Sequence, residues 1–294
     1  MKKWKKYLLL IHRYTGIVLA PIVFIWCVSG VVMMYVGYPK LSENQRIEQL
    51  GELDKLPETL RLPADIPQDN ISSLQLEMRQ NQLSFIYKNQ QNQLSASLAE
   101  TARPWSNTNA QQAMEIAAQF NGAPIMAVEE IERDQWTVYS RYHQHRPLFK
   151  VTASDPDATE LYISSRSGQV VQATTEFQRG WSWLGTVSHW LYPTFLRQHA
   201  SFWYWLVIVL TLLALLSTLT GIWLGLKQIR KKKQRLKGKG VSPYRGISKL
   251  HHIGGLAFSL FLLLFLFSGL LSMNPWGVTG IQSLSSFPDS EAIG

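Results

Sequence analysis

Three long stretches of the sequence carry no charged residue, and they constrain the fold more than any other feature. They run from Tyr14 to Pro39, from Gln198 to Leu226 and from Leu250 to Pro288. Each can supply the roughly 20 apolar residues that a helix needs to cross a bilayer. The sequence therefore predicts a membrane α-helical bundle with three transmembrane helices.

A polar region between the first two spans is long enough to form an inserted α+β domain. Apolar residues alternate with polar ones between residues 74 and 98, which is typical of a meander of short strands. Residues 110–121 form a helical pattern that Thr108 or Asn109 can cap and Gly122 can end. Further strands are expected at residues 135–142, 148–154 and 160–172.

The net charge of +9 is unevenly distributed and predicts the orientation of the chain. Four lysines lie within the first six residues, and ten basic residues with no acid lie between Lys227 and Lys249. Basic loops stay on the cytoplasmic side of a membrane. The basic run joins two spans and has no interleaved aromatic residues, so it indicates orientation in a lipid bilayer and no nucleic-acid partner.

The expected organisation follows from these two patterns. An amino-terminal cytoplasmic segment with the first span (1–39) leads into the outer domain (40–180). An interfacial helix and the second span (181–226), the basic cytoplasmic loop (227–249), the third span (250–274) and an outer tail (275–294) complete the chain.

Short cofactor motifs are absent from the sequence. Cys27 is its only cysteine, which excludes a disulfide in the outer domain and covalent haem attachment through C-x-x-C-H. There is also no G-x-G-x-x-G nucleotide motif. His143 and His145 could line a metal site, although an H-x-H pair in a hairpin is more often polar surface.

The first and third spans repeat one pattern of residues. His12 and His251 are each followed by a glycine four residues later, Gly16 and Gly255, and by a Ser-Gly pair seventeen residues later. An ionisable residue within a span is a functional hypothesis by default. Both helices run in the same direction, so the imidazoles can face each other at one depth. The glycines, one turn deeper on the same faces, leave space for a flat group.

Opposed histidines with adjacent glycines are what a haem between helices needs. The repeat therefore predicts a non-covalent b-type haem that His12 and His251 ligate. Alternative interpretations are that the histidines face lipid headgroups and that Gly16 and Gly255 serve helix packing.

The chain resembles the PepSY-associated transmembrane family over nearly its whole length. The resemblance rests on His12-Arg13-x-x-Gly16, on His189 before the second span, on Thr220-Gly221 at the end of that span and on "KLHHIGGL" in the third. The expected helix and the terminal strand pair "LYISSRSGQVV" resemble a PepSY domain. The family includes bacterial iron-regulated membrane proteins and haem-carrying siderophore ferric reductases.

The resemblance implies a haem-containing oxidoreductase in the bacterial inner membrane. Its ligand candidates here are His12, His189 and His251, where His251 is preferred over His252 because only His251 has the four-residue spacing to Gly255. One or two haems would carry electrons from a cytoplasmic donor or a membrane quinol. The acceptor would be ferric iron or a ferric siderophore on the periplasmic side, which also holds the main soluble domain. No catalytic residue is assigned.

An electron route to the outer face requires a second redox centre, because a haem near the inner face leaves much of a roughly 30 Å hydrocarbon core to cross. His189 is best placed for it, and His199 is the preferred second ligand. A thioether from Met33, Met34 or Met273, or a residue from a second subunit of a homodimer, is an alternative. His189 could instead belong to an aromatic interfacial belt.

A different class of function is a PepSY module that the helices only anchor. Such a module would bind or regulate another protein, or assist iron uptake without redox activity. It explains the outer domain but leaves the histidine repeat unexplained.

Overall fold

The computed structural model describes residues 3–50, 59–61, 71–80, 82–91, 93–231 and 240–275 of the chain. Two compact units divide the chain. Met1–Val28 and Phe195–Gly294 form one, which we call the helical unit, and Ser29–Thr194 form the other, the inserted unit.

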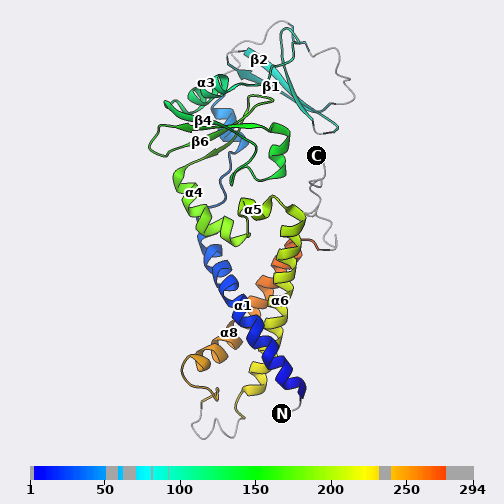
Figure 1. Cartoon of the computed structure of the whole chain (residues 1–294), viewed down its shortest axis with the longest axis vertical. Helices are drawn as coiled ribbons and strands as arrows, with labels where there is room; N and C mark the ends of the chain where they lie inside the picture. The colour runs from blue at the N-terminus through cyan, green and yellow to red at the C-terminus, as the bar shows by residue number, and fades with distance from the viewer. Residues whose placement is uncertain are drawn as a thin grey trace. The chain divides into compact units, whose positions relative to one another are not determined.

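The helical unit contains three helices that are long and apolar enough to cross a membrane. They are α1 (Lys3–Met33), whose last turn belongs to the inserted unit, α6 (Ala200–Gln228) and α8 (Gly246–Ser272). The helices α6 and α8 lie side by side (Figure 1). The prediction of three spans is therefore confirmed.

Apolar side chains and one glycine hold the three helices together. Leu19, Ala214 and Leu266, one from each helix, form a buried cluster. A Cβ on Gly225 of α6 would lie 2.9 Å from Leu256 Cδ2 of α8, so the glycine permits close approach of these helices. The ring centroid of Trp4, early in α1, lies 4.9 Å from that of Trp223, late in α6. Thus α1 and α6 run in opposite directions.

The first sheet of the inserted unit has three antiparallel strands, which pair in sequence order. These are β1 (Ile71–Arg79), β2 (Gln82–Asn89) and β3 (Leu94–Leu98). One face carries a cluster around Phe85, and the other a cluster around Ile86 that Trp105 covers. The meander expected between residues 74 and 98 is confirmed.

The second sheet has four antiparallel strands in the order β4-β5-β6-β7, and helix α3 (Ala110–Asn121) packs on one face (Figure 1). The strands are β4 (Ile125–Ile131), β5 (Leu148–Ala153), β6 (Glu160–Ser164) and β7 (Val170–Thr174). Ala113 and Ala117 of α3 contact a core that includes Phe149 and Leu161. Asn109 caps the helix start and Gly122, with φ 70°, ends it. The α+β class is confirmed.

The strand expected at residues 135–142 is wrong. Backbone N–H groups of Trp136 and Thr137 donate to Asp134 Oδ1 at 2.9 and 3.1 Å. This side-chain turn replaces a strand ladder, and a 3₁₀ helix, η2 (Ser140–His145), follows. The strand that pairs with β5 is β4, whose few buried positions made it inconspicuous in the sequence.

Short helices complete the inserted unit. They are α2 (Glu43–Glu48), α4 (Glu176–Ser182) and a π-helix, η3 (Trp183–Val187); α5 (Thr194–Arg197) then leads into α6. Ser182 Oγ donates to the Gly37 carbonyl at 3.2 Å. A Cβ on Gly185 would lie 3.1 Å from Val32 Cγ1. These contacts hold the chain before His189 against the end of α1.

Candidate functional site

His12 of α1 packs directly against α6. Its Nδ1 donates a hydrogen bond to the Ser217 carbonyl at 2.9 Å. The ring fits only because position 221 is glycine, since a Cβ there would lie 2.6 Å from His12 Cε1. A proton on Nδ1 leaves the lone pair of a neutral imidazole on Nε2. Metal-ligating histidines are commonly oriented by such a bond from the other ring nitrogen.

His251 of α8 faces His12. The two ring centroids are 6.1 Å apart and the ring planes are tilted by 40°. A metal–imidazole bond is about 2 Å long, so two imidazoles that ligate one ion from opposite sides have ring centres roughly 6 Å apart. His251 is exposed on the surface of its helix and His12 is half-buried. The pair therefore has a spacing suited to sharing a metal ion.

His252 has a different role in the structure. Its side chain is buried, Nε2 donates to the Gly225 carbonyl at 2.8 Å, and Nδ1 lies 2.8 Å from Ser242 Oγ. Because the carbonyl only accepts, Nε2 carries the proton and Nδ1 accepts from the serine hydroxyl. Both nitrogens are thus engaged, and His252 fixes the chain before α8 to the end of α6.

The glycines of the repeat differ from the packing glycines of α6. A Cβ on Gly16 or Gly255 would meet no other described atom within 4 Å, whereas Gly221 and Gly225 are each in close contact with a neighbouring helix. Helix packing therefore explains the glycines of α6 and gives no reason for Gly16 or Gly255. Both remain open positions one turn beyond His12 and His251.

His189 lies against the carboxyl-terminal part of α1, within the inserted unit. Its Nδ1 is 3.3 Å from Ser29 Oγ, and a Cβ on Gly30 would lie 3.1 Å from His189 Cε1. The His189 ring therefore packs against the Ser-Gly pair of the first span. The matching pair in α8 has no such partner among the described residues: Ser268 bonds to the Phe265 carbonyl of its own helix and Gly269 approaches Trp26 at 4.0 Å.

The proposed second ligands of His189 are not brought to it by any described contact. His199 immediately precedes α6 and belongs to the helical unit, with its Nε2 3.4 Å from the amide nitrogen of Gln198. Met33 ends α1, Met34 follows it with 80% of its side chain exposed, and Met273 is buried after α8. The partner of His189 stays a prediction.

Among the described residues, His143 and His145 do not form a metal cluster with other side chains. No group of three or more His, Cys, Asp or Glu side chains that could hold a metal occurs in the described part of the chain. Burial of His145 and, to a smaller extent, the positive charges of Lys88, Arg166 and Arg46 together lower its pKa to about 3. His145 is therefore neutral at physiological pH.

Sequence reasoning missed the contacts of three residues with these histidines: Ser217 and Gly221 contact His12, and Ser242 contacts His252. Gly221 was visible in the motif at the end of the second span, but its contact with His12 was not. The only further sign of this contact in the sequence is that Ser217 and Gly221 are four residues apart, which places both on one face of α6.

The chain matches the family model described as "PepSY-associated TM region" over residues 9–292. No curated protein and no solved structure was found to match it. The family match covers both units and all three long helices, as the sequence motifs predict.

Proposed function

The chain belongs to the PepSY-associated transmembrane family, and on this premise we propose that it is a haem-containing electron-transfer protein of the bacterial inner membrane. Its acceptor is ferric iron, bound to a siderophore, on the periplasmic side. The observation that carries the proposal is the pair of facing imidazoles, His12 and His251, with ring centroids 6.1 Å apart.

The residues around this pair fit a b-type haem. His12 and His251 would hold the haem iron, with Ser217 holding the His12 ring through Nδ1. Open positions at Gly16 and Gly255 admit a bulky group close to the helix backbones. A bis-histidine haem supplies one-electron transfer and has no open position for oxygen. The protein itself would hold the two imidazole rings in place and determine which nitrogen of each ring carries the proton.

Electrons enter from the cytoplasmic side, from a quinol in the membrane or from a soluble donor. No nucleotide motif occurs in the sequence, so the donor is a separate molecule. His189 would hold a second haem, with His199, a methionine or a second subunit as the other ligand, and this group would supply one-electron transfer towards the outer face. The position of His189 against Ser29 and Gly30 supports this assignment, since both residues belong to a membrane-spanning helix.

An absorbance spectrum of the purified, detergent-solubilised protein tests the proposal. We expect a Soret band and sharp α and β bands after reduction, and acid-acetone should extract the pigment because no cysteine attaches it. A colourless protein from haem-replete cells would exclude the haem. That result would favour the alternative of a membrane-anchored interaction module or an iron-uptake accessory protein.

Replacing Gly16 or Gly255 by leucine is expected to lower the haem content of the protein. Neither glycine packs against a described neighbour, so the leucine side chain would enter the space that the macrocycle needs. Leucine is also the better helix former, so the helix itself should not suffer. The measurement is haem per protein after purification, with Gly254→Leu as a control that shares the open surroundings of Gly255. Full haem content in Gly255→Leu would contradict the macrocycle placement.

Replacing His189 by alanine is expected to remove one of two haems and to leave the His12–His251 haem in place. The haem-to-protein ratio should fall from two to one, and chemically reduced protein should reduce a ferric chelate more slowly. His143→Ala, in the same unit, is the control. If His189→Ala changed neither haem content nor electron transfer to the chelate, the outer haem would have to be abandoned.

A further inference from the structure

A buried arginine whose guanidinium makes no hydrogen bond to a described residue lies in the inserted unit, far in sequence from the membrane histidines. Arg79 ends β1, and only 6% of it is exposed. Its Nε, Nη1 and Nη2 atoms are buried and have no hydrogen-bond partner among the described residues. Burial lowers the pKa of Arg79 to about 10, so the guanidinium remains charged at neutral pH. A buried, unpaired charge is costly, and proteins normally pair it.

Other donors around the guanidinium also lack acceptors. Arg79 lies over the Trp105 ring, with 4.0 Å between its Cζ and the ring centroid. Trp105 Nε1 and Thr108 Oγ1 are buried and have no partner in the described structure. A Cβ on Gly168 would lie 2.7 Å from Arg79 Nη2 and 3.1 Å from Thr108 Oγ1, so these two groups are close together. Hydrogen-bond donors therefore outnumber acceptors here.

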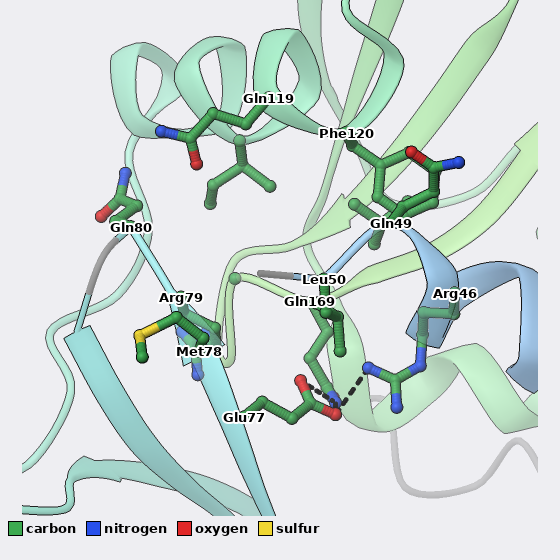
Figure 2. Close-up of a pocket in the computed structure, with 13 residues that line it drawn as sticks. Arg46, Gln49, Leu50, Glu77, Met78, Arg79, Gln80, Gln119, Phe120 and Gln169 are labelled. Carbon is green, nitrogen blue, oxygen red and sulfur yellow. Dashed lines mark hydrogen bonds and ion pairs between the residues drawn. The ribbon is translucent and has the colours of Figure 1, made fainter. Parts of the chain in front are cut away.

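The nearby carboxylate is already engaged. Glu77, two residues before Arg79 on the same face of β1, accepts from Arg46 Nη1 at 2.5 Å and from Gln169 Nε2 at 3.1 Å. Figure 2 shows these bonds, with Gln80 and Gln119 on the opposite side of the cavity.

A cavity of about 360 Å³ adjoins this cluster and is lined by Arg79, Gly168, Gln169 and residues of α3. We propose that it binds a small oxyanion, a carboxylate or a phosphate, whose charge is balanced by Arg79. Guanidinium groups suit both ligands because they donate two parallel hydrogen bonds. Since the Arg79 nitrogens are covered, the Gly168–Gln169 turn has to shift for the anion to reach them. The bound anion is then enclosed with these donors.

Thermal unfolding of the full-length protein in detergent tests this site. Citrate and inorganic phosphate are the probes, each titrated against sodium chloride at equal ionic strength. A ligand that binds only the folded state raises the unfolding temperature with a saturable dependence on concentration, here by a few degrees. The probe that raises the unfolding temperature at the lower concentration shows whether the site prefers a carboxylate or a phosphate. Haem content is measured in parallel, so a colourless protein that still binds the anion separates this proposal from the haem proposal.

Variants assign the effect to Arg79. Arg79→Gln should lose the saturable shift, and Arg79→Lys should keep a weaker one because it retains the charge. Arg103→Gln, at an exposed arginine outside the cavity, should respond like the unchanged protein. Isothermal titration of the unchanged protein should give one anion per chain, even if Arg79→Gln fails to fold. No response to either probe, or equal loss in Arg103→Gln, would overturn the site.

Discussion

Replacing either His12 or His251 by alanine is expected to abolish the bis-histidine signal of the haem that we propose at this pair. The two rings face each other with centroids 6.1 Å apart, and each would supply one axial nitrogen. Loss of one ligand would leave the proposed iron with an open position and would remove its coordinate bond to one helix. The reduced spectrum should lose the sharp α band of that haem, and the haem-to-protein ratio should fall by about one.

His252→Ala is the matched control, because it removes an adjacent histidine from the same helix. Its hydrogen bonds to Gly225 and Ser242 predict a loss of stability, of about 1–3 kcal/mol for the buried partners that remain unsatisfied. The spectrum should keep its bis-histidine form. Equal loss of haem from His251→Ala and His252→Ala would contradict the assignment of His251 as the ligand.

Adding a single methyl group at Gly221 is expected to weaken haem binding strongly, although Gly221 carries no ligand. In Gly221→Ala the new Cβ would lie 2.6 Å from His12 Cε1, which is too close for any contact between these atoms. The ring must move and would lose its bond to the Ser217 carbonyl. Disturbing the groups that orient a metal ligand typically costs about 10- to 100-fold in affinity. Titration of haem into the apoprotein measures this loss.

Gly254→Ala makes the same change in α8 at a position where the added Cβ would meet no described atom within 4 Å. Its haem affinity should equal that of the unchanged protein. If Gly221→Ala also bound haem with unchanged affinity, the His12 ring could not be held against α6 as the structure places it.

Much of the architecture could be predicted from local patterns. Charge-free stretches locate the spans because a bilayer tolerates few charged residues, and alternation locates β1, β2 and β3 because strand side chains point to alternate faces. The error at residues 135–142 shows the limit of this reasoning. Trp136, Val138 and Tyr142 are buried as a strand pattern suggests, yet Asp134 binds the backbone N–H groups that a strand would need.

The histidine repeat itself was readable in the sequence, because fixed spacing along a helix places residues on one face. Whether the two faces meet depends on how the helices pack. The sequence alone left His251 and His252 as alternatives, since adjacent residues on a helix point about 100° apart and either could face inward. In the structure His252 bonds to Gly225 and Ser242 whereas the His251 ring lies beside His12, and which of them ligates a haem stays a prediction.

By itself, the sequence determined the three membrane helices, the α+β class of the inserted unit and the family, because each depends on periodicity or on motifs read along the chain. Only the tertiary structure decided which ring nitrogens are engaged, which glycines are in contact and where a guanidinium is buried without a hydrogen bond to any described residue. His12 against Gly221, His189 against Gly30 and Arg79 against Gly168 are contacts between segments far apart in sequence. Such contacts depend on side-chain packing across helices and sheets, which no local pattern records.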